Sequence, residues 1–135
     1  MAARNVSVLG LYNDQGEILL QHRSKDAIRL PDYWAFFGGG IEKDETPEQA
    51  LARELHEELE YSVKAPVLIF SQKFIYKEDE NTKYVYIERF NPDKPLVQHE
   101  GQEMKWWKFE DMDHLLIVDH DRIALAKIKE FLQKL

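Results

Sequence analysis

Apolar residues near the start of the chain fall into two short runs separated by a polar segment. The first run spans 6–12 and is rich in residues that favour β-strands, and the second spans 17–22 and contains Ile18, Leu19 and Leu20. The segment between them, 13–16 (Asn-Asp-Gln-Gly), has the composition of a turn. The pattern therefore predicts a β-hairpin at the beginning of the fold.

Further β-strands are expected at 33–37, 67–76, 83–90 and 105–109. Within 83–90 the side chains alternate, with Tyr84, Tyr86 and Glu88 on one face and Val85, Ile87 and Arg89 on the other. The polar segment 23–32 is expected to form a loop, and the charged segment 77–82 the tip of a second hairpin.

Two segments have the periodicity of amphipathic helices. The first spans 47–59, where Thr46 suits the N-cap and Pro47 the first helical position. The second spans 119–135, with apolar positions at Ile123, Leu125, Ala126, Ile128, Leu132 and Leu135. The order strands, helix, strands, helix predicts an α+β fold, an α/β/α sandwich with a mixed or antiparallel sheet between helices, in one domain over 1–135.

Composition narrows the function classes. A net charge of −7 argues against a nucleic-acid polymer as partner, although a divalent cation can neutralise a small phosphorylated ligand. The absence of cysteine excludes disulfides and a thiolate nucleophile. No apolar run approaches the roughly 18 residues that span a bilayer, and the first residues lack the apolar segment of a secretory signal. We therefore expect a cytoplasmic protein without a membrane partner.

Charge is concentrated on one face of the helix predicted at 47–59. Because an α-helix turns about 100° per residue, Glu57 and Glu58 lie about 60° and 40° to either side of Glu54, with Arg53 about 100° away. Such a face is commonly solvated, with Arg53 and Glu57 paired. The glycine triplet at 38–40 favours a second interpretation, in which the carboxylates bind a metal ion. Glycines let the backbone approach a ligand closely, and clustered carboxylates suit Mg²⁺ or Mn²⁺.

The spacing of these residues resembles the Nudix box, Gly-x5-Glu-x7-Arg-Glu-U-x-Glu-Glu-x-Gly-U, where U is a bulky aliphatic residue. The positions in register are Gly39, Glu45, Arg53, Glu54, Leu55, Glu57 and Glu58. Glu60 and Tyr61 depart from the box, which has a glycine and an aliphatic residue there. Since that glycine normally ends the helix in a left-handed turn, Glu60 is expected to cost up to ~1 kcal/mol or to change how the helix stops.

The resemblance to the Nudix family implies hydrolysis of a nucleoside diphosphate linked to another group, with Mg²⁺ or Mn²⁺ as cofactor. The ligands that it implies are a carbonyl of Gly38 or Gly39 and the carboxylates of Glu54, Glu57, Glu58 and Glu100. Glu100 is chosen because the sequence 99–102 followed by Trp106-Trp107 resembles the late loop of MutT-type members, with Glu103 as an alternative and a solvated role also open. Glu54 is expected to be the general base, and Arg53 to orient the carboxylates through Glu45.

Several residues outside the box are candidates for substrate contacts. Arg23 could bind a phosphate, or be an ordinary surface arginine. Aromatic residues on the strands could stack on a base or pack in the core, namely Trp34, Phe36, Phe74 and Tyr76. Asp121, which follows His120 at the start of the last helix, could accept from a purine N–H group or cap the helix.

The resemblance favours a MutT-like (d)NTP pyrophosphohydrolase, including one that acts on 8-oxo-dGTP. Tyr76-Lys77 occupies the neighbourhood where ADP-ribose hydrolases carry a proline, which disfavours ADP-ribose, and a tyrosine there is reminiscent of dinucleoside polyphosphate hydrolases. Two alternatives from other classes stay open: a catalytically silent module that binds a nucleotide or a protein partner, and a purely structural acidic domain whose glutamates are solvated. Members of the family are often dimeric, so a homodimer is also open.

Overall fold

The computed structural model describes residues 4–99 and 103–135, which fold into one mixed sheet and two long helices. In chain order the elements are β1 (Val6–Tyr12), β2 (Glu17–His22), β3 (Trp34–Ala35), β4 (Phe37–Gly40), α1 (Pro47–Leu59), β5 (Val67–Tyr76), β6 (Asp79–Arg89), β7 (Glu103–Lys108), a 3-10 turn (Phe109–Asp111) and α2 (Asp119–Gln133).

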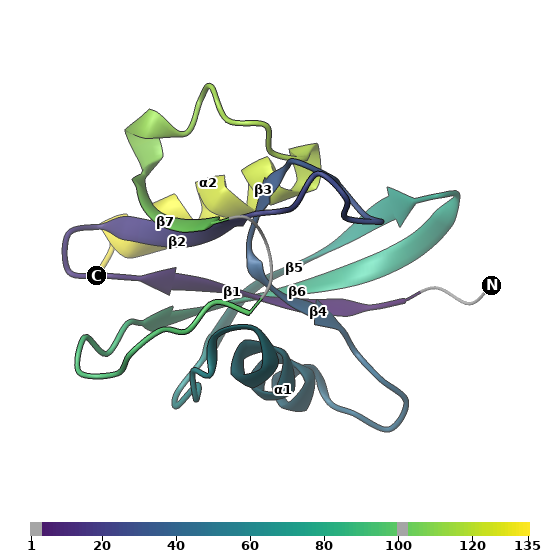
Figure 1. Ribbon diagram of the computed structural model, residues 1–135, viewed down its shortest axis with the longest axis horizontal. Helices are drawn as coiled ribbons and strands as arrows, with labels where there is room; N and C mark the ends of the chain where they lie inside the picture. Colours follow the sequence, from purple (N-terminus) through teal and green to yellow (C-terminus); the bar gives the residue numbers. More distant parts are fainter. Residues whose placement is uncertain (1–3, 100–102) are drawn as a thin grey trace.

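Strand β1 is the centre of the sheet. It pairs antiparallel with β2 and with β4, and parallel with β6, so the sheet is mixed as expected. Strand β6 pairs in turn with β5, and β2 pairs with β3 and β7. The parallel β1–β6 pair is possible because the long connection between them contains α1 (Figure 1).

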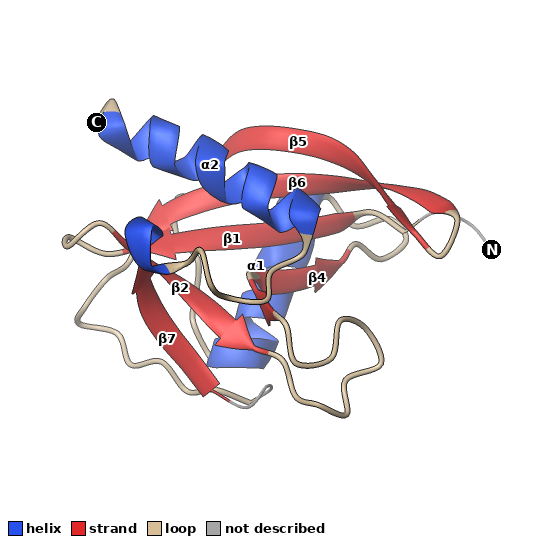
Figure 2. Ribbon diagram, turned by 90° about the horizontal axis from the view of Figure 1, so that it is seen from above, coloured by secondary structure: helices blue, strands red, loops and turns tan. Residues whose placement is uncertain are grey.

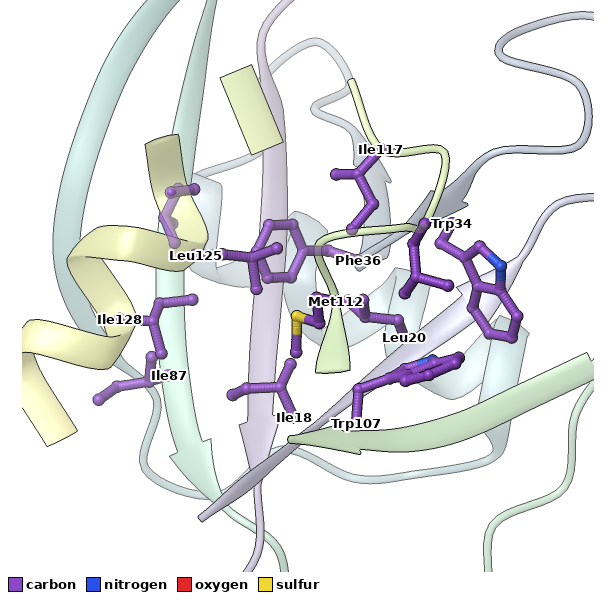
Figure 3. Packing of buried hydrophobic residues seen from close by; sticks show 13 residues of the cluster. Ile18, Leu20, Trp34, Phe36, Ile87, Trp107, Met112, Ile117, Leu125 and Ile128 are labelled. Carbon is purple, nitrogen blue, oxygen red and sulfur yellow. The ribbon is translucent and has the colours of Figure 1, made fainter. Parts of the chain in front are cut away.

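The two helices cover opposite faces of the sheet, which confirms the α/β/α sandwich (Figures 1 and 2). Under α1, the buried core contains Leu9, Leu11, Leu19, Phe37, Leu51, Leu55, Leu59, Tyr61 and Tyr86. On the α2 side the buried residues include Ile18, Leu20, Val85, Ile87, Trp107, Leu125 and Ile128 (Figure 3). The alternation predicted along β6 is therefore correct, because Tyr86 faces one core while Val85 and Ile87 face the other.

Helix α1 begins and ends as its local sequence predicts. The Thr46 hydroxyl accepts from the Gln49 N–H at 3.1 Å, and the Gln49 side chain accepts from the Thr46 N–H at 2.9 Å. Pro47 is the first helical residue. Glu60 ends the helix in the left-handed conformation with φ of 53°, where the box has glycine. Its carboxylate lies 2.5 Å from His99 Nε2, so the unusual residue also contacts the loop that leads to β7.

Four element boundaries differ from the prediction. The aromatic segment 33–37 is divided between β3 and β4, and β4 continues through the glycines. Strand β6 begins at Asp79 rather than 83, because Lys77 and Glu78 both have positive φ and form a two-residue turn. Strand β7 spans Glu103–Lys108, and α2 ends at Gln133. Over the described residues, no helix is long and apolar enough to cross a membrane.

Candidate active site

The glycine triplet is part of the sheet, and at two of its positions neighbouring atoms lie where a Cβ atom would be. Gly38 has φ of 139°, and a Cβ there would lie 2.1 Å from the carbonyl oxygen of Ser7 on β1. A Cβ on Gly39 would lie 2.6 Å from the carboxyl carbon of Glu54. Glycine is therefore required at position 38 for β4 to pair with β1, whereas at position 39 it leaves room for the Glu54 carboxylate from α1.

Arg53 links the carboxylates of the box to β4. Its Nε and Nη2 donate to the two oxygens of Glu45 at 2.8 and 2.9 Å, and its Nη1 donates to Glu54 Oε1 at 2.8 Å. Nη2 also donates to the carbonyl oxygen of Gly40 at 2.9 Å. Hydrogen bonds from Arg53, and then from the Glu42 N–H, lower the pKa of Glu45 to about 2, while the bond to Glu45 raises the pKa of Arg53. The expected contact between Arg53 and Glu45 is present.

The three helical glutamates are not equivalent. Glu54 and Glu58 line one cavity, and Glu58 Oε1 accepts from the Gly38 N–H at 2.9 Å. Glu57 is more exposed, with its Oε1 3.7 Å from Arg53 Nη1, and it is not part of the cavity wall. In the described part of the chain, no three His, Asp or Glu side chains are close enough together to hold a metal ion. Glu100 lies outside the described residues, and Glu103 Oε1 lies 3.8 Å from His22 Nδ1 on β2.

The cavity has a volume of about 320 Å³, which is within the range of small-molecule sites. Gly38 and Gly39 contribute to its wall beside Glu54 and Glu58. Of the predicted substrate residues, Arg23, Phe36, Tyr76 and Asp121 also line it, as does Phe74. Trp34 does not line the cavity. It is buried between the His22 ring, stacked at 4.6 Å, and Trp107, in edge contact at 5.2 Å, and Figure 3 shows it beside Trp107 in the core.

Arginines at the cavity are held by the loop at 23–32. Arg23 Nε donates to the carbonyl oxygen of Arg29 at 2.8 Å. The Arg29 guanidinium lies 4.2 Å above the centre of the Tyr76 ring, so the loop contacts the β5–β6 hairpin. Leu30 and Asp32 in this loop have positive φ. The contacts place cationic groups in the same wall as the box carboxylates.

Asp121 does not cap α2, so that part of the prediction is wrong. The N-cap residue is Val118, and no side chain caps the helix there. The Asp121 carboxylate is buried and contacts the ammonium group of Lys83, which is 1% exposed. Lys83 Nζ also lies 2.7 Å from His120 Nδ1.

Burial and charge act in opposite directions on the pKa values of this pair. Burial lowers the pKa of Lys83, although the Asp121 charge opposes the shift. Burial alone would raise the pKa of Asp121, but His120 and Lys83 together hold it below its usual value.

Lys83 is a functional candidate that the sequence prediction missed. The alternation along β6 could have indicated it. Lys83 lies on the same face of the strand as Val85 and Ile87, and these two residues face the α2 core. A lysine on an apolar face is unusual unless it is paired. The sequence did not show that its partner would be Asp121 on α2, which lies 38 residues further along the chain.

Comparisons with known proteins agree on the family. The family model of the NUDIX domain matches residues 1–128. An RNA pyrophosphohydrolase of Cellvibrio japonicus is 31% identical over 128 residues, which are 90% of this chain and 62% of the relative. The chain thus spans less than two thirds of that relative's length.

Solved structures of similar fold cover nearly the whole chain. The MutT NUDIX hydrolase from Burkholderia pseudomallei superposes with a TM-score of 0.81 at 22% identity, covering 95% of this chain and 99% of that one. The E. coli ORF135 protein has a TM-score of 0.78 at 27% identity, covering 95% of this chain and 89% of that one. At 22% identity, the similarity to the Burkholderia pseudomallei protein shows the fold alone.

Proposed function

The chain belongs to the NUDIX domain family, and from that premise we propose that it is a Mg²⁺- or Mn²⁺-dependent hydrolase of the pyrophosphate linkage in a nucleotide. One observation carries the proposal: the box carboxylates Glu54 and Glu58 share a single cavity with the aromatic residues Phe36 and Phe74. Carboxylates suit a cation that binds phosphate oxygens, and flat apolar rings suit a base. The cavity therefore offers both halves of a nucleotide site.

The donor set fits a hard divalent cation. The Glu54 carboxylate lies against Gly39, and Glu58 Oε1 accepts from the Gly38 N–H, so both carboxylates lie beside β4. Carboxylate oxygens are ligands that Mg²⁺ and Mn²⁺ prefer. We assign the ion to Glu54, Glu57, Glu58, Glu100 and a carbonyl of Gly38 or Gly39. When bound, such an ion neutralises phosphate charge and lowers the pKa of a bound water.

The remaining roles follow from the contacts around α1. Glu54 takes a proton from the attacking water, because its carboxylate lines the cavity and Arg53 orients it by a 2.8 Å hydrogen bond. Arg53 itself contacts carboxylates and a carbonyl oxygen, which makes it a positioning residue. Arg23 lines the cavity and is assigned to a substrate phosphate.

The substrate that we propose is a (d)NTP, with an oxidised purine nucleotide such as 8-oxo-dGTP as the form to test first. Support comes from the cavity volume and from Phe36, Phe74 and Asp121 in its wall, which can contact a base by stacking and by hydrogen bonding. The test is a hydrolysis panel of (d)NTPs, 8-oxo-dGTP, ADP-ribose and diadenosine polyphosphates with Mg²⁺, followed by product identification. Nucleoside monophosphate and pyrophosphate are expected from the triphosphates. Release of nucleotide only from ADP-ribose or the dinucleotides would assign another substrate, and no hydrolysis at all would overturn the proposal.

A second candidate substrate is the 5′-triphosphate end of an RNA, since the relative from Cellvibrio japonicus is named an RNA pyrophosphohydrolase. The observation that favours it is the pairing of cations with an aromatic ring, since Arg29 and Lys77 both lie over Tyr76. Such a surface suits nucleotides beyond the first one. Pyrophosphate release from a short triphosphorylated RNA, measured against the same amount of free GTP, distinguishes the two candidates. A preference for free nucleotide would exclude the RNA.

A further inference from the structure

Glu60 is unfavourable for the end of α1 in two respects. Its φ of 53° lies in the left-handed region, which favours glycine. Its carboxylate also stands at the C-terminal end of the helix, where the helix dipole disfavours negative charge. A residue that is unfavourable for its own helix on both counts is informative about the contacts that its side chain makes elsewhere.

The Glu60 side chain contacts the loop that leads to β7. His99 Nε2 donates to Glu60 Oε2 at 2.5 Å, since an ionised carboxylate only accepts. Two main-chain hydrogen bonds join the same parts of the chain. The His99 N–H donates to the carbonyl oxygen of Glu58 at 2.9 Å, and the Val97 N–H donates to that of Leu59 at 3.0 Å. These three hydrogen bonds form what we call the loop clamp.

The loop clamp acts on the last turn of α1, which carries two carboxylates assigned to the metal ion, Glu57 and Glu58. The last carbonyl groups of a helix have no partner within it, and helix ends fray. In α1 the loop supplies partners for two of these groups, and Glu60 fixes the loop by its side chain. Fraying would move the carboxylates away from β4, where the Gly38 N–H donates to Glu58 Oε1 at 2.9 Å.

We propose that Glu60 is a positioning residue for the metal site. Through His99 it holds the loop against the last turn of α1, and so keeps Glu57 and Glu58 in place for a divalent cation. The two residues of the pair act through the helix backbone and not as ligands. The inference rests on the proposed function for the cation and adds how its ligands are held.

Calorimetric titration with Mn²⁺ alone tests this positioning role. Both side chains of the pair are about half exposed, so its contribution is modest, and Glu60→Gly and His99→Leu should each raise the Kd for Mn²⁺ about two- to fivefold. The double variant should bind like either single variant, because both substitutions remove the same contact. His56→Leu is the matched control and should bind like the wild type, since this exposed histidine of α1 lies outside the loop clamp.

The His99 variant separates the loop clamp from two simpler effects of Glu60→Gly. Loss of negative charge near the ion would weaken Mn²⁺ binding in Glu60→Gly but not in His99→Leu, which keeps the carboxylate. A loss of stability has the wrong sign, because glycine relieves the left-handed strain at this position. Weaker binding in Glu60→Gly alone would therefore overturn the positioning role.

Amide hydrogen exchange in EDTA reports the loop clamp without metal or turnover. The amides of Val97 and His99 donate to the end of α1, so in Glu60→Gly they should exchange about two- to fivefold faster than in the wild type. Unchanged exchange at both amides would show that the side-chain pair does not hold the loop, and the inference would be wrong.

These measurements also separate the inference from the proposed function. If the wild type binds Mn²⁺ but hydrolyses no nucleotide, the proposed function fails, while a raised Kd in the variants still supports the positioning role. If the wild type hydrolyses nucleotides and all the variants bind Mn²⁺ equally, the positioning role fails alone. Absence of Mn²⁺ binding by the wild type would overturn both.

Discussion

Gly38 is the position where backbone geometry and the candidate site depend most directly on one residue. Replacing it with alanine places a Cβ 2.1 Å from the Ser7 carbonyl oxygen and 2.7 Å from the Val8 Cα, both of them backbone atoms of β1. The native φ of 139° is also a conformation that alanine rarely adopts. Neither problem is relieved by a side-chain rotation, so β4 must move away from β1.

The expected loss of stability combines these two effects. Backbone strain of this kind costs about 1–3 kcal/mol, and forcing a methyl group into packed atoms adds about 1–3 kcal/mol. Gly38→Ala should therefore lower the free energy of unfolding by about 2–6 kcal/mol, a large share of the 5–15 kcal/mol typical of a domain. Because the Gly38 N–H donates to Glu58 Oε1, the displacement should also weaken metal-dependent turnover.

Urea unfolding measures this loss against a matched control. Gly16 also has positive φ, 75°, but no atom lies within 4 Å of a Cβ built there. Gly16→Ala should thus show only the conformational penalty, about 1 kcal/mol. At a slope near ~2 kcal/mol/M, a loss of 3 kcal/mol shifts the midpoint by about 1.5 M. A Gly38→Ala midpoint no lower than that of Gly16→Ala would refute the reasoning from the β1–β4 contact.

Three further predictions concern α1 and its ends. The pKa of Glu45 is lowered from 4.5 to about 2 by the hydrogen bond from Arg53, so the stabilisation from this pair is complete above pH 4.5 and lost as the pH falls toward 2. Melting temperatures of the wild type and Glu45→Gln should hence differ at neutral pH and converge near pH 2, and a constant difference would contradict this. Arg53→Lys should lower kcat by about tenfold or more with little change in melting temperature. The reason is that one ammonium group cannot reproduce the forked contacts of the guanidinium. Steady-state kinetics that match the wild type would count against the positioning role. Glu60→Gly should raise the free energy of unfolding by up to about 1 kcal/mol. Relief of the left-handed strain at this position exceeds the small contribution of the exposed ion pair with His99. A lower free energy of unfolding in urea would show that the ion pair contributes more than the strain costs.

Local signals explain which elements could be predicted. The bounds of α1 follow from Thr46 and Pro47 at one end, and the bounds of β5 from a run of apolar and aromatic residues. The contact between Arg53 and Glu45 was expected from the resemblance to the Nudix box, and it forms across the short loop and helix that connect the two residues. A hairpin tip was predicted at 77–82, but its restriction to Lys77 and Glu78 was not, since neither residue is among those that favour positive φ.

Contacts between distant segments account for the rest. The glycines were expected to face a ligand, but their pairing with β1 depends on how the sheet assembles. Lys83 and Asp121 each look ordinary in their own segment, and only the packing of α2 on the sheet joins them. Trp34 could stack on a base or on a core residue, and the position of Trp107 decided in favour of the core. The prediction for Glu100 falls outside the described residues and stays a prediction.

The most direct test of the account is turnover of the nucleotide panel in Mg²⁺ by the wild type and by the double variant Glu57→Gln, Glu58→Gln. Both substitutions keep the size of the side chain and remove its charge. We predict nucleotide hydrolysis by the wild type that EDTA abolishes, and a loss of at least about 100-fold in the variant with an unchanged unfolding midpoint. Equal turnover of the two proteins would contradict the assignment of these glutamates to the metal.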